Sequence, residues 1–360
     1  MATIKDVAQM AQVSAMTVSR VLNGKGYVSE EKRQKVLSCV EKLNYRPNQL
    51  ARSLVLSKSS TVGILLSHIE NPVYGQYVSS MAAYFRKRGM DIILYCADSY
   101  ATAFSGIQTL LDKQVDGVII LPLESYEEAD RWGNTDAFLK NMSGLLNRQQ
   151  RPFVVIGDNE YTPHDNWVRE DYRGGAELAV DCLVRAGHRR IGNVCWGDAP
   201  SGLWKERDDG FHAAMRRHGL EVNESWRCAV GDDDVGRARE ATLKMLYQTK
   251  ELPSAMFCYN DAFAVGAIQA LREKGLRVPE DISIVGHDGN LYSRCTAPHL
   301  TTVSIRARET GRAAAKMLLD ILRRRIPDKD NHLLIPPELV AGGTVLFCEE
   351  GPKQIGRWED

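Results

Sequence analysis

Hydrophobic positions near the start of the chain repeat at intervals of three and four residues, the spacing of one helix face. The first set consists of Ile4, Val7, Ala8 and Ala11. The second set consists of Val18, Val21 and Leu22. Residues 12–14 separate the two sets, which leaves room only for a tight turn. The pattern therefore predicts two short helices joined by that turn.

Polar residues stand where both predicted helices need caps. Thr3 and Asp6 have the spacing of a capping box, and Ser14 is a good cap for the second helix. Opposite the hydrophobic side of that helix lie Met16, Ser19 and Arg20, with Ala15 at its leading end. Such a pair of helices suits a helix-turn-helix that enters the DNA major groove. An ordinary helical hairpin inside a larger core is the alternative.

A third helix is predicted after residues 29–31, and its apolar side completes a small core. That side consists of Val36, Leu37, Val40 and Leu43. The added helix favours a small DNA-binding head over a buried hairpin.

From Thr61 onward, short β-rich runs alternate with helical patterns. The strand-like runs are residues 61–66, 91–97, 117–121, 153–157, 190–195, 254–259, 281–286 and 301–305. The helical stretches are residues 74–88, 103–113, 135–147, 173–186 and 262–274. Alternating strands and helices predict open parallel sheets with a crevice at the carboxyl ends of their strands. The number of strands suits two sheets.

Length and charge agree with a chain of several parts. The 360 residues are too many for one compact core. Net charge is zero, but residues 1–60 contain ten Lys or Arg and four Asp or Glu, a balance of +6 that the remainder offsets. A basic head on a mildly acidic body fits a head that meets phosphates.

Other classes of protein are disfavoured by what the sequence lacks. The eight cysteines show no close metal-site pairs, and we expect those in apolar runs, such as Cys96, Cys195 and Cys258, to be buried thiols. Lys5 and Asp6 interrupt the N-terminus, and no apolar run is long enough to cross a membrane, so we expect a cytoplasmic protein. Neither HExxH, GxSxG nor a phosphate-binding glycine loop is present, so we expect no enzyme, no metal site and no cofactor.

An ordered set of motifs runs along nearly the whole chain. They are TIKDVA, TVSRVLNG, LNYRPN, ARSL, IENPVYG, VDGVII, GHRRIG, RDDGF, NDAFAVGA, GLRVPEDISIVGHD and LTTV. In these motifs the chain resembles the LacI/GalR family of bacterial transcription regulators. The resemblance implies a small all-α helix-turn-helix head with a hinge helix, joined to an α/β two-lobed, periplasmic-binding-protein-like (type I) domain with open parallel sheets.

The resemblance also implies domain bounds. The head would span residues 1–46, the hinge helix and linker 47–60, the effector-binding and dimerisation domain 61–345, and a tail 346–360. The N-lobe would comprise about 61–160 and 292–321, and the C-lobe about 161–291 and 322–345. The tail has no heptads, so we expect a homodimer without a tetramerising helix.

Matching motif positions assign roles on DNA. Arg20 would pair with a guanine, and Ala15 and Met16 would make apolar base contacts. The residues expected at the DNA backbone are Thr17, Ser19, Tyr45 and Arg52. Leu54 matches the family residue that wedges into the minor groove and kinks the duplex. A plain linker with an incidental leucine is the alternative there.

Matching positions also assign an effector site. The expected residues are Tyr74, Asp158, Trp204, Arg207, Asn260 and Asp288. We favour ligand contact for Arg207 and Asp288. Asn260 faces the cleft or caps a helix, and Asp261 is more simply a structural cap. Trp204 stacks on a ligand or packs inside, and Asp158 is a loop residue unless it replaces the family's acid at Gly157.

The sequence therefore predicts a ligand-responsive repressor that binds a pseudo-palindromic operator as a homodimer. The expected partners are double-stranded operator DNA and a small-molecule effector, with no membrane. A sugar or sugar derivative is the expected effector. A purine or nucleoside effector and, less favoured, a solute-binding protein are the alternatives.

Overall fold

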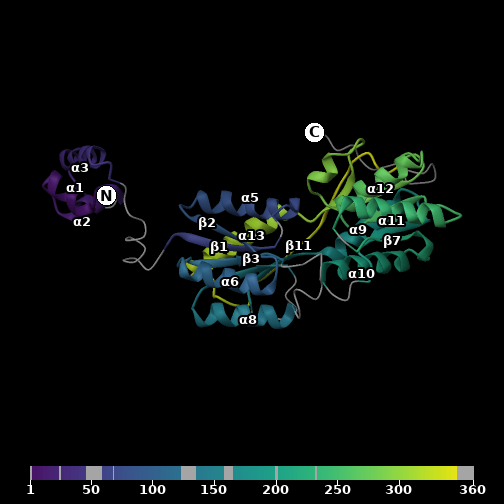
Figure 1. Ribbon diagram of the computed structural model, residues 1–360, viewed down its shortest axis with the longest axis horizontal. Coiled ribbons are helices and arrows are strands. Elements are labelled where there is room, and N and C mark those ends of the chain that lie inside the picture. The colour runs from purple at the N-terminus through teal and green to yellow at the C-terminus, as the bar shows by residue number, and fades with distance from the viewer. Residues whose placement is uncertain are drawn as a thin grey trace. The chain divides into compact units, whose positions relative to one another are not determined.

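The computed structural model divides the chain into two compact units, Met1–Ser59 and Ser60–Asp360 (Figure 1). The structure describes residues 2–23, 26–45, 59–67, 69–122, 135–157, 165–198, 202–231 and 233–346. Each unit is described by itself. The expected hinge helix lies outside the described residues, as does nearly all of the C-terminal tail.

The described part of the first unit contains three helices, α1 (Ile4–Ala11), α2 (Ala15–Asn23) and α3 (Glu30–Lys42). Both predicted N-terminal caps are confirmed. Thr3 and Asp6 form a capping box, and Ser14 Oγ accepts the backbone N–H of Thr17 at 3.1 Å. Gln12 ends α1 in the left-handed conformation with a φ of 53°, which turns the chain toward α2.

The core of the first unit holds the apolar sides of all three helices. Its buried members are Val7, Ala8, Ala11, Val18, Val21, Val36 and Cys39. The prediction for Leu37 was wrong, because this side chain is 42% exposed. Cys39 takes the inward position, since it lies three residues after Val36 and therefore on the same helix face.

Two six-stranded sheets form the second unit. The N-lobe sheet has the order β11-β5-β4-β3-β1-β2. Its strands are β1 (Thr61–Leu66), β2 (Asp91–Cys96), β3 (Gly117–Ile120), β4 (Phe153–Ile156), β5 (Trp167–Glu170) and β11 (His332–Ile335). All its pairings are parallel, as the alternating pattern predicts.

The C-lobe sheet has the order β12-β10-β9-β8-β6-β7. Its strands are β6 (Ile191–Cys195), β7 (Arg227–Ala229), β8 (Ala255–Cys258), β9 (Ser283–Asp288), β10 (Thr301–Ser304) and β12 (Glu338–Val340). Only β12 pairs antiparallel among the described strands, as an edge strand beside β10. Every crevice-forming strand end therefore points the same way within its lobe.

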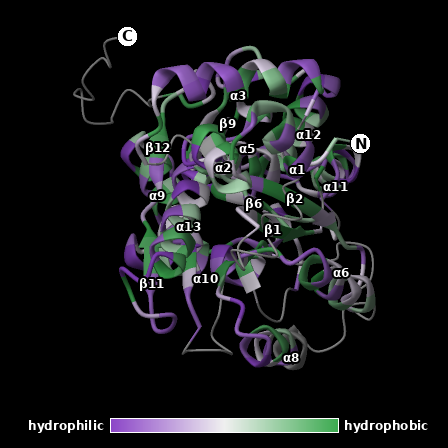
Figure 2. Ribbon diagram, turned by 90° about the vertical axis from the view of Figure 1, so that its left-hand side faces the viewer, coloured by the Kyte–Doolittle hydropathy of each residue, from purple (hydrophilic) through white to green (hydrophobic). Residues whose placement is uncertain are grey.

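Helices cover both faces of each sheet. The N-lobe helices are α5 (Pro72–Arg86), α6 (Tyr100–Asp112), α8 (Thr135–Arg148) and α13 (Ala307–Leu322). The C-lobe helices are α9 (Tyr172–Arg185), α10 (Gly202–Arg217), α11 (Val235–Gln248) and α12 (Asp261–Glu273). In Figure 2 these helices change between purple and green along their length, as expected of helices with one buried side.

The lobe boundaries differ from those expected near residues 160, 291 and 322. Strand β5 still belongs to the N-lobe sheet, and β10 to the C-lobe sheet. The chain therefore crosses between lobes at Asp171, at 305–306 and at 336–337. The expected boundaries were wrong because short strands lie at the crossings. The sheet that such a strand joins is decided by the neighbour with which it pairs, and the hydrophobic pattern does not reveal that neighbour.

The structure also tests the predicted helix after β3 and the predicted burial of three cysteines. Helix α8 begins at Thr135, as predicted for the long segment after β3, while Trp132 lies outside the described residues. Cys195 and Cys258 are buried as predicted, but Cys96 is exposed because β2 is an edge strand.

Candidate functional site

A pocket lies where the two lobes meet. It is lined by polar and aromatic side chains from both lobes, among them Asn71, Tyr74, Tyr172, Trp204, Arg207, Asp233, Asn260 and Asp288. Its free volume is about 30 Å³, enough for about one or two water molecules. A ligand of sugar size therefore enters only when the lobes separate or the lining rearranges.

Arg207 of α10 is one of the residues that line this pocket. Its Nη2 donates to Asp288 Oδ1 at 2.6 Å, and both side chains are almost fully buried. The guanidinium carbon lies 4.6 Å from the ring centre of Tyr172 and 4.8 Å from that of Trp204. Two aromatic rings and one carboxylate thus fix the plane of the guanidinium. The contact brings together two residues that the motif positions assign to one effector site.

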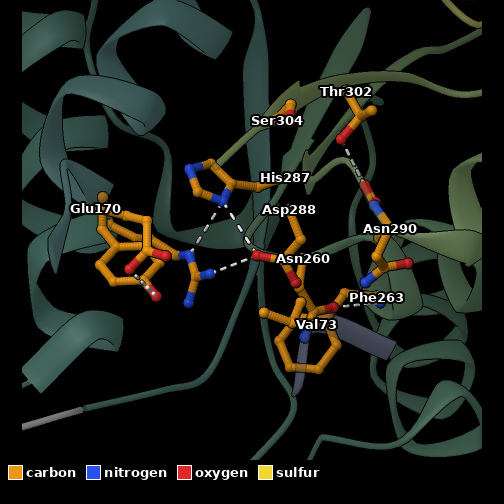
Figure 3. A network of polar contacts seen from close by, with 12 residues as sticks. Val73, Glu170, Asn260, Phe263, His287, Asp288, Asn290, Thr302 and Ser304 are labelled. Atoms are coloured by element: carbon orange, nitrogen blue, oxygen red, sulfur yellow. Dashed lines mark hydrogen bonds and ion pairs between the residues drawn. The ribbon is translucent and has the colours of Figure 1, made fainter. Parts of the chain in front are cut away.

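His287 and Asp288 lie side by side at the end of β9 (Figure 3). His287 Nδ1 is 3.4 Å from Arg207 Nε and 3.3 Å from Asp288 Oδ1. Complete burial, and then the Arg207 charge, lower the pKa of His287 to about 4. The ring is therefore neutral near pH 7, and Nδ1 can accept the Arg207 Nε–H.

The backbone at Asp288 is strained. Its φ is 104°, a conformation that residues with side chains rarely adopt. Asp261 stabilises the following turn, because its carboxylate accepts the Asn290 N–H at 2.8 Å and the Thr302 hydroxyl at 2.5 Å. Such strain persists only where surrounding contacts determine the geometry.

Asp261 itself is fully buried. Burial, together with the nearby charge of Asp288, raises the pKa of Asp261 well above its ordinary value. A structural role was expected for Asp261, but as a cap. The structure assigns the cap of α12 to Asn260, whose side-chain oxygen accepts the Phe263 N–H at 2.7 Å.

Asn260 meets both alternatives left open by the sequence, because it caps α12 and also lines the pocket. Its amide nitrogen donates to Asp233 Oδ1. The other oxygen of Asp233 accepts the side-chain amide of Asn71 at 3.2 Å. The sequence analysis missed Asp233, because β7 before it spans three residues and was not predicted.

Two aromatic residues of the pocket, Tyr74 and Trp204, are fixed by hydrogen bonding and by ring stacking. Tyr74 donates its hydroxyl to the Pro122 carbonyl at 2.8 Å. Trp204 stacks with both Trp196 and Phe263, with ring centres 4.8 and 5.8 Å away. Trp204 is therefore a packed aromatic residue that also lines the pocket. Asp158 lies outside the described residues.

A buried carboxyl group stands beside the first lobe crossing. This group is Glu170 (Figure 3). Its carboxyl accepts the Tyr77 hydroxyl at 2.7 Å and lies 3.5 Å from the Tyr172 hydroxyl. Burial raises the pKa of Glu170 to about 7, against the opposing effect of these hydrogen bonds. The sequence analysis missed this group and Tyr172, because β5 was not recognised as a strand.

On the first unit, α2 presents the side chains expected at DNA bases. Ala15, Met16 and Arg20 are exposed, and Met16 is 64% exposed although it is apolar. Of the residues expected at the DNA backbone, Thr17 and Ser19 are half-buried, and Tyr45 packs against the core of this unit. Arg52 and Leu54 lie outside the described residues.

Two searches of the described residues gave negative results. No group of three or more His, Cys, Asp or Glu side chains there is placed to hold a metal ion. No described helix has the length and apolar character needed to cross a membrane.

A three-helix DNA-reading unit and a two-lobed body with a polar cleft define a class of ligand-binding transcription regulators. Residues 3–48 match the model of bacterial regulatory proteins of the lacI family, and residues 180–345 match that of a periplasmic binding protein-like domain. The chain is 33% identical to the HTH-type transcriptional repressor PurR of Aliivibrio salmonicida over 96% of its own length and 99% of the relative's. The protein belongs to the LacI family of transcriptional repressors.

Solved structures agree with this assignment. The lac repressor dimer bound to operator and the anti-inducer ONPF aligns with a TM-score of 0.82 at 28% identity, covering 96% of this chain and 99% of that one. The complex of the transcriptional regulator CelR with cellobiose aligns with a TM-score of 0.68 at 26% identity, covering 96% and 100%. The predicted fold class and family are thereby confirmed.

Proposed function

We propose that this repressor binds a pseudo-palindromic operator as a homodimer and that a sugar or sugar derivative in the inter-lobe cleft controls the binding. The observation that carries the proposal is the cleft itself. Arg207, Asp288 and Asn260 place fixed donors and acceptors beside aromatic side chains, between lobes that must move to admit a ligand. The role is one of binding, and no bond is made or broken in it.

Polar groups of this kind suit a ligand with several hydroxyl groups. A hydroxyl both donates and accepts, so it can pair with the carboxylate of Asp288 and with the guanidinium of Arg207. Tyr172 and Trp204, which line the pocket, would contact the apolar C–H groups of a sugar ring with the parts of their rings that remain uncovered. The solved complex of the regulator CelR with cellobiose supports this chemistry as a proposal for the present chain.

The DNA side of the proposal assigns base contacts to the exposed face of α2. Arg20 would pair with a guanine, and Ala15 and Met16 would contact thymine methyl groups. Thr17, Ser19, Tyr45 and Arg52 would position the head on the DNA backbone, and Leu54 would wedge into the minor groove. Effector binding would shift the lobe equilibrium, and the lobes would set the spacing at which two hinge segments can pair on DNA.

A thermal-shift screen tests the effector. Neutral sugars, sugar phosphates and purines would be added to the purified full chain. A ligand at 100 times its Kd stabilises by about 2.7 kcal/mol, which raises the melting temperature measurably. We expect a sugar to give the shift and Arg207→Ala to abolish it. A shift given by purines and by no sugar would contradict the sugar assignment.

The same compounds would then be added to the protein bound to a duplex selected from random sequence. We expect the hit from the first screen to change operator affinity in either direction. A hit that binds in the cleft and leaves operator affinity unchanged would contradict control by this cleft.

A further inference from the structure

One carboxylate in the pocket connects the two lobes. Asp233 lies between β7 and α11 of the C-lobe, and Asn71 lies between β1 and α5 of the N-lobe. Asn71 Nδ2 donates to Asp233 Oδ2 at 3.2 Å, although 162 residues separate the two in the chain. This hydrogen bond therefore spans the cleft.

Both asparagines that meet Asp233 are fixed by the helices they cap. Asn71 Oδ1 accepts the Val73 N–H at 2.9 Å at the start of α5. Asn260 Oδ1 accepts the Phe263 N–H at the start of α12. Because the side-chain oxygen of each asparagine accepts the capping N–H, the side-chain nitrogen of each points into the pocket. Asp233 receives one amide on each of its oxygens.

We propose that Asp233 is a positioning residue that holds the lobes closed by joining the capping asparagines Asn71 and Asn260. The hydrogen bond between Asn71 and Asp233 is the one that resists opening of the lobes, because Asp233 and Asn260 both belong to the C-lobe and move together. Asn260 orients the carboxylate toward Asn71. Separation of the lobes breaks the Asn71 contact and leaves the Asn260 contact intact.

A second polar contact between the lobes lies elsewhere. Arg169 of β5 and Glu206 of α10 form an ion pair at 3.1 Å, with side chains 28% and 21% exposed. It lies outside the residues that line the pocket, and its solvent exposure weakens it. The Asp233 contact is placed in the cleft lining, where an effector would meet it. The inference goes beyond the proposed function and needs neither an effector nor DNA.

Hydrogen–deuterium exchange of the full chain, read by mass spectrometry, tests the proposal. Asn71→Asp keeps the oxygen that caps α5 but sets one carboxylate against Asp233. We expect amides in residues 203–210, on the C-lobe side of the pocket, to exchange about tenfold faster, because a hydrogen bond to a charged group is lost and repulsion is added. A purely local effect on the cap would change only residues 71–77.

The double variant Asn71→Asp/Asp233→Asn restores a donor and an acceptor across the cleft. We expect exchange in residues 203–210 to return toward the wild-type rate. Asp198→Asn is the matched control for the Asp233→Asn half of this variant, because it removes one carboxylate charge from an exposed C-lobe site, where Asp198 pairs with Arg227. Unchanged exchange in residues 203–210 of the Asn71→Asp variant, or failure of the double variant to restore protection, would overturn the proposal.

Unaltered exchange in residues 78–86 of α5 and 211–217 of α10 would show that both lobes remain folded in every variant. Since the measurement omits effector and operator, its failure would leave the proposed regulation by the cleft standing. Failure of the ligand screen would likewise leave the interlobe contact standing.

Discussion

Arg207 and Asp288 form a buried ion pair, with 2.6 Å between Nη2 and Oδ1 and less than a tenth of either side chain exposed. The pair joins α10 to the end of β9, at a residue whose φ of 104° is strained. Each charge is compensated by the other and by aromatic or hydrogen-bonded neighbours. The pair therefore stabilises the arrangement of the pocket only while both members are present.

Removal of both members should cost less than the sum of the two single removals. We expect Arg207→Met to lower the free energy of unfolding by about 3–5 kcal/mol, because Asp288 is left as an uncompensated buried charge. The double variant Arg207→Met/Asp288→Asn should lose less than the sum of the two single variants, as groups in contact do. Chemical denaturation measures all four proteins. Additive losses would show that the pair is energetically uncoupled.

Glu170 should make stability depend on pH near neutrality. Its carboxyl has a pKa of about 7 in the fold, against an ordinary value of 4.5. Between these values the folded state keeps a proton that the unfolded state has released, so stability falls as pH rises. We expect the wild type to lose about 2.5 kcal/mol relative to Glu170→Gln between pH 5 and pH 8.

The comparison with Glu170→Gln isolates this group, because His287 and Asp261 remain in both proteins. The amide of the variant keeps an acceptor for the Tyr77 hydroxyl without a titrating proton. Parallel stability curves for the two proteins would show that Glu170 has no raised pKa.

Much of the fold could be predicted from the sequence, because its elements have strong local patterns. The eight predicted strands all appear, and Thr61–Leu66 has the predicted bounds. Strands β5, β7, β11 and β12 were missed. They have three or four residues each, and such runs take their conformation from the neighbours with which they pair.

The pocket was predicted less completely than the fold, for a related reason. Arg207 and Asp288 stand in long motifs, and the structure brings them together. Asp233 and Tyr172 follow the missed strands β7 and β5, so nothing local marked them as pocket residues. The same holds for Glu170, which is buried and contacts Tyr77 of α5, 93 residues away in the chain.

Two glycines offer a matched test of close packing. A Cβ at Gly175 of α9 would lie 2.3 Å from His287 Nε2, whereas a Cβ at Gly75 of α5 meets nothing within 4 Å. We expect Gly175→Ala to destabilise the protein by about 1–3 kcal/mol through overpacking. Gly75→Ala should be neutral or stabilise by up to about 1 kcal/mol, since alanine favours helix. Thermal unfolding of both variants checks the contrast. Equal effects would mean that the His287 ring moves aside freely.

A substitution at Arg20 tests whether this side chain contacts a DNA base or the phosphate backbone. Its exposed position on α2, beside exposed Met16 and Ala15, suits a bidentate contact with one guanine of each half-site. We expect Arg20→Ala to weaken binding to a selected operator by about 1–3 kcal/mol and to relax specificity at a single base pair. Fluorescence anisotropy on duplexes altered one base pair at a time measures both effects. A phosphate contact would instead weaken every duplex equally and lower the salt dependence of binding, because fewer counterions would be released. That outcome would move Arg20 from base recognition to backbone positioning.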